Sequence, residues 1–186
     1  MAYIGTGVEY ALHCLLWLVN TDDKRPSSRD LAEIQGVPTA FVAKIFSKLE
    51  RAGIVEASGG IRGGYSLAKE PEEISVLEVI DAVEGHKPIF DCKEIRGRCA
   101  LFDSDPPKWS SRGVCGIHAV MLNAEKAMRN ELATVTLASL SASVFGKGMP
   151  QSFVNDVKIW FSERQMARED ARISGMRSRS KSTKDI

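Results

Sequence analysis

The chain has 186 residues, of which 44% are hydrophobic and 26% are charged, and this balance excludes an intrinsically disordered chain. No stretch approaches the roughly 20 apolar residues of a membrane span, and the N-terminus lacks the basic leader of a signal peptide, so the sequence predicts a cytoplasmic protein without membrane contact. The net charge of +1 conceals two basic segments, residues 24–69 with eight basic and four acidic side chains and residues 162–186 with seven and four. Such patches are typical of phosphate binding.

Three short helices are predicted in the N-terminal segment. The first spans about Gly7–Asn20, where apolar residues recur at helical spacing. The second begins after Ser27, an N-cap residue followed by Asp30 three positions later, and ends at Gly36, which allows a left-handed cap. The third begins at Pro38, because a proline is tolerated in the first turn of a helix.

The third helix has two unlike faces. Its apolar stripe consists of Val42, Ile45, Phe46 and Leu49. Its opposite face carries small and basic side chains, namely Thr39, Ala40, Ala43, Lys44, Ser47, Lys48 and Arg51. Small residues let a helix approach the floor of the DNA major groove, and basic residues reach the phosphates. Two helices joined by a glycine turn, the second with such a face, predict a helix-turn-helix.

A β-hairpin is predicted next. Residues 54–57 and 65–68 have the composition of strands, and the seven residues between them include four glycines. Arg62 near the tip of this loop suits a narrow minor groove, where the negative potential attracts a guanidinium. Alone this would be an ordinary surface hairpin, but after a helix-turn-helix it is interpreted as the wing of a winged helix.

A fourth helix is predicted to begin at Ser75, which forms a capping box with Glu78, and to end at Gly85. The helical pattern is lost over residues 86–113 and returns in a long helix at about 115–135. The apolar stripe of this long helix is larger than so small a domain can bury, so it predicts the seam of a homodimer.

The expected fold is mainly α-helical, with a small β-hairpin wing and a long dimerisation helix. Its predicted parts are a winged helix-turn-helix DNA-binding domain (1–85), a cysteine-containing sensor loop (86–114), a dimerisation helix (115–140) and a C-terminal extension (141–186). Apolar residues at 153–161 predict one short amphipathic helix in the extension, and the Ser, Arg and Lys residues from Ser162 on predict disorder.

Two sequence runs carry a family resemblance. The run FVAKIFSKLERAGIV at 41–55, followed by GGYSLA at 63–68, resembles the Rrf-two family of bacterial winged-helix transcription regulators, which has IscR-, NsrR-, RirA- and CymR-like members. The helix at 75–84 and the run TLASL at 136–140 are also similar, so the resemblance covers about residues 1–140. It implies a homodimer that binds double-stranded DNA at a palindromic operator. It also implies an iron–sulfur cluster in the cysteine loop of several members and none in CymR-like ones.

The sequence departs from the family pattern at two places. The arginine that relatives carry just before the wing glycines is absent, and Arg62 stands later in the loop. Cluster-binding relatives have closely spaced cysteines, whereas Cys115 follows Cys99 by sixteen residues here. These departures leave both the minor-groove contact and the cluster open.

The cysteines predict a cofactor site. Thiolates suit iron–sulfur clusters because sulfur is a soft anionic ligand, and in a reducing cytoplasm a polar loop with several cysteines favours metal or redox chemistry over structural disulfides. His118 follows Cys115 by one helical turn, and this pair resembles the end of the IscR-like ligand motif. NsrR-like members take a carboxylate from the first helix, which corresponds to Glu9. The expected ligands are Cys92, Cys99, Cys115 and His118, with Glu9 as the alternative fourth ligand and a 2Fe–2S cluster favoured over 4Fe–4S.

Two other interpretations of the cysteines stay open. One is a cluster-free thiol switch, because the N-terminus of a helix favours the thiolate of Cys115, and Cys92 or Cys99 could form a disulfide with it. Positive charge nearby in sequence comes from Arg96, Arg98 and Arg112. The other is zinc or no site, and the lack of closely spaced cysteine pairs argues against zinc. Cys14 in the first helix is interpreted as a core residue.

The leading hypothesis is a repressor that senses redox state, iron or nitric oxide. The residues expected at DNA are Thr39, Ala40, Lys44 and Lys48 in the major groove, Arg62 in the minor groove, and Arg29 and Arg51 on phosphates. The alternative from another class is a winged-helix protein-interaction module, which would lack salt-dependent DNA binding. No nucleophile elbow, phosphate loop, zinc-protease motif or pair of carboxylates occurs in the sequence, so no enzyme is predicted.

Overall fold

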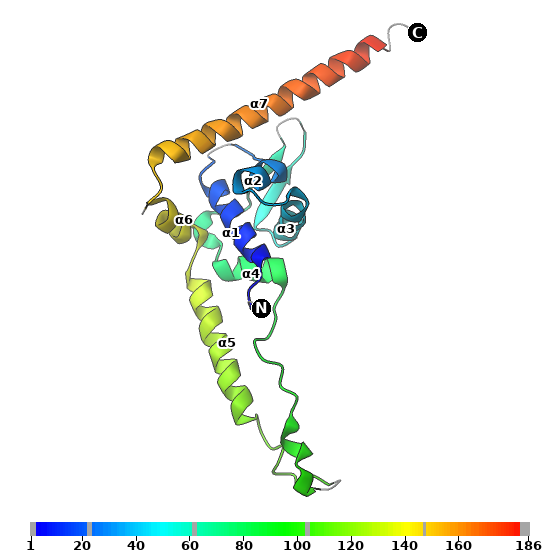
Figure 1. Cartoon of the computed structure of the whole chain (residues 1–186), viewed down its shortest axis with the longest axis vertical. Helices are drawn as coiled ribbons and strands as arrows, with labels where there is room; N and C mark the ends of the chain where they lie inside the picture. The colour runs from blue at the N-terminus through cyan, green and yellow to red at the C-terminus, as the bar shows by residue number, and fades with distance from the viewer. Residues whose placement is uncertain (1–2, 22–23, 61–62, 103–104, 147, 183–186) are drawn as a thin grey trace.

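The computed structural model of the chain describes residues 3–21, 24–60, 63–102, 105–146 and 148–182. It is mainly helical with one antiparallel hairpin among these residues (Figure 1). The elements are α1 (Thr6–Val19), α2 (Ser28–Gln35), α3 (Thr39–Arg51), β1 (Val55–Ser58), β2 (Gly64–Leu67), the 3-10 turn η1 (Pro71–Glu73), α4 (Val76–Glu84), the 3-10 turns η2 (Ile95–Arg98) and η3 (Ala100–Phe102), α5 (Gly116–Thr134), α6 (Leu137–Gly146) and α7 (Gln151–Ser182). Within the described ranges, no helix combines the length and the apolar character that crossing a membrane requires.

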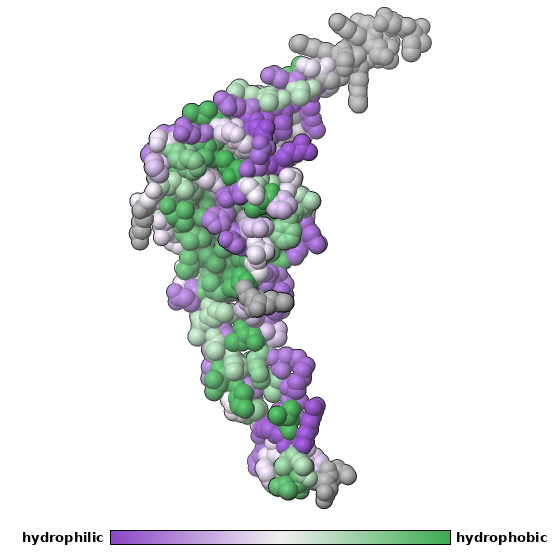
Figure 2. All heavy atoms as spheres, in the orientation of Figure 1, coloured by the Kyte–Doolittle hydropathy of each residue, from purple (hydrophilic) through white to green (hydrophobic). Residues whose placement is uncertain are grey.

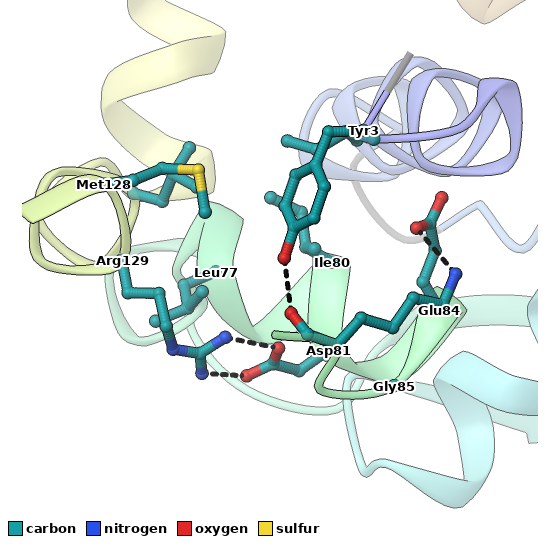
Figure 3. A pocket seen from close by; sticks show the side chains of 11 residues that line it. Tyr3, Leu77, Ile80, Asp81, Glu84, Gly85, Met128 and Arg129 are labelled. Carbon is teal, nitrogen blue, oxygen red and sulfur yellow. Dashed lines mark hydrogen bonds and ion pairs between the residues drawn. The ribbon is translucent and has the colours of Figure 1, made fainter. Parts of the chain in front are cut away.

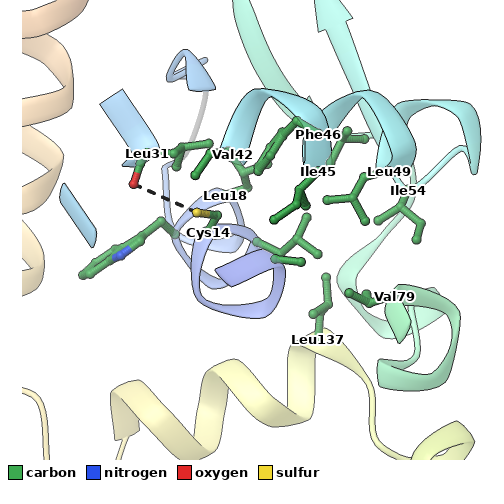
Figure 4. Packing of buried hydrophobic residues seen from close by; sticks show 14 of the residues in the cluster. Cys14, Leu18, Leu31, Val42, Ile45, Phe46, Leu49, Ile54, Val79 and Leu137 are labelled. Carbon is green, nitrogen blue, oxygen red and sulfur yellow. Dashed lines mark hydrogen bonds between the residues drawn. The ribbon is translucent and has the colours of Figure 1, made fainter. Parts of the chain in front are cut away.

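Helix α1 is the centre of the hydrophobic core. Helices α2, α3, α4 and α6 all contact it, and Figure 4 shows their side chains converging around Cys14 and Leu18. The large side chains of Phe46, Leu49 and Leu137 are fully buried there. Each buried side chain of this size stabilises the fold by about 1.5–3 kcal/mol, so the core holds the helix-turn-helix and α4 as one unit.

The capping signals seen in the sequence are confirmed. Ser27 and Asp30 form a capping box at the start of α2, where the Asp30 carboxylate accepts the Ser27 backbone N–H at 2.8 Å. Gly36 ends this helix with φ of 64°, a left-handed conformation that glycine adopts without strain. Ser75 and Glu78 form a second capping box at the start of α4. These local interactions set the turn of the helix-turn-helix and the start of the helix behind it.

The long helix predicted at about 115–135 is α5, and the dimerisation segment predicted at 115–140 continues past it into a second helix. Helix α5 ends at Thr134 and α6 begins at Leu137, because the link between them pairs with the residues before α4. The Val76 N–H donates to the Val135 carbonyl at 2.8 Å, and the Leu137 N–H donates to the Ile74 carbonyl at 2.9 Å. This pairing turns the chain so that α6 packs on α1 while α5 leaves the core.

Helix α7 is longer than the sequence predicted. Its first turns bury Val154, Val157 and Phe161, and Trp17 of α1 contacts Phe153 with ring centroids 6.3 Å apart. The sequence predicted a short helix and disorder from Ser162 on, whereas α7 continues to Ser182. Residues 162–182 contain five arginines and two each of Glu, Ala and Met, which favour helix, and two of the arginines pair with carboxylates of α2.

Candidate nucleic-acid interface and cysteine arm

The predicted recognition surface lies on α3, the helix that follows the turn at Gly36. Thr39, Ala40 and Lys44 are all exposed on it, while the opposite face of the helix is buried in the core. An exposed helix with small side chains and a lysine fits the width of the major groove. The structure therefore leaves this face accessible to a duplex.

Of the remaining residues predicted to contact DNA, two are exposed and one is bonded to α4. Arg29 at the start of α2 and Arg51 at the end of α3 are exposed. Lys48 differs from the prediction, because its ammonium donates to the Val83 carbonyl near the end of α4 and not toward the exposed face. The last carbonyls of a helix attract cations, and the long lysine side chain reaches them. Arg62 lies outside the described residues.

The wing is fixed against the segment that precedes α2. Strands β1 and β2 pair in antiparallel register, and the Tyr65 N–H donates to the Pro26 carbonyl at 2.9 Å. The Tyr65 ring packs edge-on against Phe46, with centroids 4.8 Å apart. A Cβ on Gly64 would lie 1.9 Å from the Arg25 carbonyl oxygen, so only glycine allows this approach.

The cysteine arm, residues 86–115, extends away from the winged-helix domain and forms the lower end of the molecule in Figure 1. Its first residues are held to α5. The Glu125 carboxylate pairs with His86 Nε2 at 2.9 Å and accepts the Ile89 N–H at 3.2 Å. The bond from His86, followed by that from Ile89, lowers the pKa of Glu125. The arm is thus anchored to the long helix at its base.

The structure does not gather the predicted cofactor ligands into one set. Cys92 and Cys115 are half-buried, and Cys115 is the N-cap of α5, while Cys99 is exposed beyond η2. Among the described residues, no three His, Cys, Asp or Glu side chains are close enough to hold a metal ion together. The donor types suit iron–sulfur chemistry, but the described structure does not bring three of them together.

Arg96 of η2 links the outgoing part of the arm to the residues just before α5. Its guanidinium bonds the Glu94 carboxylate through Nε at 2.6 Å and Nη2 at 2.9 Å, and it donates to two carbonyl oxygens just before α5 at 3.3 and 2.8 Å. The bond to Glu94 raises the pKa of Arg96 most, and the charges of Cys115 and Cys92 raise it further. A fixed cation therefore lies within electrostatic reach of both sulfurs.

Glu94 is held in an unusual backbone conformation. Its φ is 46°, and it is the one non-glycine residue with positive φ in the described part of the chain. Such a conformation is strained and persists only where surrounding contacts compensate. The bond from Arg96 is that contact, and it lowers the pKa of the Glu94 carboxylate.

The two candidate fourth ligands lie at different places. His118 lies on the first turns of α5, and the centroid of its ring is 6.1 Å from the ring centroid of Phe90 in the arm. Glu9 lies on α1 and lines an open groove of about 560 Å³ together with Leu132 and Leu140. Within one chain, His118 is the candidate that belongs to the arm.

A small joint connects α5 to the winged-helix domain (Figure 3). Arg129 of α5 forms a two-point ion pair with Asp81 of α4, at 3.0 and 2.7 Å. Three residues further along α4, Glu84 accepts the Gly5 N–H at 2.6 Å, and this bond lowers the pKa of Glu84 most. The cavity between these residues holds about 20 Å³ and is too small for a ligand larger than water. We therefore interpret these contacts as a structural connection between α5 and α4 and not as a ligand site.

An apolar surface runs along α5 and the adjoining side of the winged-helix domain (Figure 2). Ile117 and Val120, which are three residues apart and share one side of α5, are exposed. The groove that contains Glu9 continues this surface over α1, α4 and α6, and apolar side chains form most of its lining. Apolar patches of this extent mark interaction sites.

Known proteins match this arrangement. A family model described as "Rrf2: Iron-dependent Transcriptional regulator" matches residues 4–143. The chain belongs to the Rrf2 family. Protein rrf2 of Nitratidesulfovibrio vulgaris is 30% identical over 136 residues, which are 73% of this chain and 84% of that protein. The transcriptional repressor NsrR of Streptomyces coelicolor is 30% identical over 140 residues, which are 74% and 87% of the two chains.

Solved Rrf2-type structures share the fold. CymR, the global cysteine regulator of B. subtilis, superposes with a TM-score of 0.59 at 22% identity, covering 77% of this chain and 99% of that one. T. potens IscR gives a TM-score of 0.58 at 23% identity, covering 79% and 92%. The predicted winged-helix fold is therefore confirmed. As an Rrf2-family member, the chain is a DNA-binding transcription regulator and not an enzyme.

Two features of this Rrf2 protein were missed by sequence reasoning. Arg96 was noted only as a charge near the cysteines, because its partners before α5 lie sixteen and seventeen residues away and meet it only after the arm folds back. The contacts of α7 with α2 were missed entirely. The only signal in the sequence was the basic character of residues 162–186.

Proposed function

We propose that this Rrf2 protein is a cytoplasmic repressor that binds a palindromic operator as a homodimer and responds to redox state, iron or nitric oxide through its cysteine arm. The observation that carries this proposal is that α5 connects the cysteine arm to the DNA-binding domain. The exposed recognition helix and wing belong to a domain that α4 and the Asp81–Arg129 pair join to α5, and α5 begins at Cys115 of the arm. A change at the cysteines therefore acts on the helix that supports the DNA-binding domain.

The residues proposed at DNA are those of the exposed surface. Thr39, Ala40 and Lys44 would enter the major groove from α3. Arg29 and Arg51 would contact phosphates, and Arg62 at the wing would enter the minor groove. In this division residues 1–85 bind DNA and residues 86–114 sense the signal. Lys48 has a different role, because it ties α3 to the end of α4.

The proposed homodimer rests on the apolar surface. A second α5 would cover the exposed Ile117 and Val120 and would fill the groove over α1 and α6. Burying such a surface removes apolar area from water and is the usual driving force for association. A two-fold dimer would present two recognition helices to the two halves of a palindrome.

The proposed cofactor is an iron–sulfur cluster. Its support is the description of the family as iron-dependent and the donor types that the arm and the start of α5 carry, Cys92, Cys99, Cys115 and His118. A bound cluster would supply a group that oxidants and nitric oxide attack. Because no three of these donors are gathered among the described residues, loading would require the arm to rearrange. Glu9, as the alternative ligand, would have to reach the arm of the other subunit.

A thiol switch is the second candidate, and Arg96 favours it. This guanidinium is held by Glu94 and by the carbonyl oxygens just before α5, and the charges of Cys115 and Cys92 raise its pKa. Oxidation of the two thiols by hydrogen peroxide would form one disulfide and two water molecules, so that the peroxide accepts both electrons and both protons. The relation to CymR is one of fold and fits this candidate equally well.

One experiment separates the two candidates. The protein is purified without oxygen, and its visible absorption, iron and sulfide are measured for the wild type and for single alanine variants of the four cysteines. A cluster predicts a coloured, iron-containing protein that loses iron in the Cys92, Cys99 and Cys115 variants and keeps it in Cys14→Ala. A colourless, iron-free wild type would contradict the cluster. A Cys92–Cys115 disulfide found by mass spectrometry after peroxide treatment would then establish the switch.

A further inference from the structure

Helix α7 lies outside the part of the chain that matches the family, which ends at residue 143. Figure 1 shows it passing along the end of the winged-helix domain that carries α2 and the strands β1 and β2. Its buried residues, Val154, Val157 and Phe161, hold its first turns on the domain. The guanidinium of Arg164 then stacks on Trp160 at 4.8 Å, which begins a basic face.

Two arginines of this face pair with carboxylates of α2. Arg164 pairs with Glu33, and Arg168 pairs with Asp30. The Asp30 side chain is only 6% exposed, since it also caps α2. Both carboxylates belong to the first helix of the helix-turn-helix, where negative charge repels phosphates. The ion pairs therefore neutralise the two acidic side chains on this helix.

Two open grooves separate α7 from the DNA-binding surface. One, of about 490 Å³, lies between α7 and the residues Ser28, Arg29 and Thr39. The other, of about 540 Å³, lies between α7 and the wing, and Arg168 and Arg172 line it. Each groove thus has one wall from α7 and the other from the surface proposed to bind DNA.

The guanidinium groups on the α7 side retain unused hydrogen-bond donors. In the described part of the chain, Arg168 Nη2 is buried without a hydrogen-bond partner, and Arg172 forms no ion pair with another described residue. Arg172 follows Arg168 by one helical turn, so it continues the same face toward the wing. Arginine in such a position offers paired donors to a phosphate.

The charge of this face indicates what lies against it. A helix that masked the DNA-binding surface would place carboxylates opposite its basic residues. The residues of α7 that line the grooves are arginines and alanines, namely Arg164, Ala167, Arg168, Ala171 and Arg172. Arg164 and Arg168 are balanced by Glu33 and Asp30, so Arg172 and Arg29 on the opposite wall leave the grooves with an excess of positive charge, which attracts a polyanion.

We propose that α7 is a third element of the DNA interface, beside the recognition helix and the wing, and that Arg168 and Arg172 bind the phosphate backbone of the duplex. The inference rests on the proposed DNA-binding function and extends it to a segment that the family match does not cover. It assigns the phosphates of one strand to the groove between α7 and the wing.

The test measures the affinity of the full chain for a labelled random-sequence duplex of about 30 base pairs over a series of salt concentrations. Arg172→Ala is expected to weaken binding about tenfold at low salt and to lower the slope of log K against log salt by about 1. Arg172→Glu is expected to weaken binding further. Lys126→Ala, which removes an exposed cation from α5, is the matched control and should leave both quantities unchanged.

The outcomes separate this inference from the function on which it rests. Unchanged affinity and slope in both Arg172 variants, beside a loss of binding in Lys44→Ala, would overturn the role of α7 and leave the DNA-binding function intact. Tighter binding by Arg172→Glu would also overturn it, because α7 would then mask the surface. If the wild type does not bind the duplex at all, the proposed function fails and the inference fails with it.

Discussion

The four cysteines differ in their surroundings, and Cys14 is the extreme case. It is buried in the core of α1 with Sγ 4.0 Å from the Leu31 carbonyl oxygen, and burial raises its pKa to about 12. A thiol reacts through its thiolate, so Cys14 should stay unmodified when the native protein is treated with iodoacetamide, while Cys99 is alkylated. Peptide mass spectrometry before and after unfolding measures this. Equal labelling of Cys14 and Cys99 in the native protein would contradict the burial.

The carboxylate of Glu78 makes the stability of the fold depend on pH. Its bond from the Ser75 backbone N–H lowers its pKa below the ordinary value of 4.5. Because the folded-state pKa is lowered, the contribution to stability is present above pH 4.5 and is lost as the pH falls through the folded-state pKa. Glu78→Ala should cost about 0.5–1 kcal/mol of unfolding free energy at neutral pH and much less at about pH 3.

Urea unfolding at the two pH values checks this expectation. Glu72→Ala is the control, since Glu72 is exposed in η1 and does not cap a helix. A cost of the Glu78 substitution that stayed the same at both pH values would show that the capping bond does not depend on the charge.

Single residues show what sequence can reveal and where it fails. Ser27, Asp30 and Gly36 were predicted correctly because a cap depends only on neighbours within a few positions. The direction in which the Lys48 side chain points was not predicted, because its hydrogen-bond partner at the end of α4 is 35 residues away in the sequence. The same limit applies to Arg96. Its sequence neighbours suggested only positive charge, and its bonds depend on how the arm folds back.

Among the elements, the wing yields the sharpest prediction, because two of its glycines have opposite surroundings. A Cβ at Gly64 would clash with the Arg25 backbone, whereas a Cβ at Gly59 would meet nothing within 4 Å. Gly64→Ala should therefore lower the unfolding free energy by about 1–3 kcal/mol and detach the wing, while Gly59→Ala should be close to neutral. Thermal unfolding and DNA affinity of both variants test this. Equal effects of the two substitutions would mean that the close approach does not hold the wing.

The ends of elements were harder to predict than their existence. The helices α1 to α4 and the hairpin were foreseen from periodicity and turn residues. The separate helix α6 was not foreseen, because its start depends on the pairing of residues 135 and 137 with residues 76 and 74, a contact across some 60 positions of sequence. The length of α7 was missed for the same reason. Its ion pairs with α2 join residues more than 130 positions apart, and composition alone suggested disorder.

At the scale of the whole molecule, the contacts form a path from the arm to the DNA-binding face. Glu125 holds the base of the arm to α5, Arg129 joins α5 to α4 through Asp81, and the end of α4 accepts the ammonium of Lys48 from α3. Each step is a polar contact with defined geometry. These bonds connect α5 to the recognition helix, and a signal at the proposed cysteine sensor would have to pass along them.

The proposed dimer would bring the contact paths of two subunits to one operator, so the interface on α5 can be tested directly. Val120→Asp places a carboxylate on the exposed apolar side of α5, where it costs little in a single chain but would be desolvated in a dimer. Sedimentation velocity should show a dimer for the wild type and a monomer of unchanged helicity for this variant. Leu122→Asp is the matched control, because two residues turn the helix by about 200° and put the same change on another face. A Val120→Asp protein that sediments like the wild type would remove α5 from the interface.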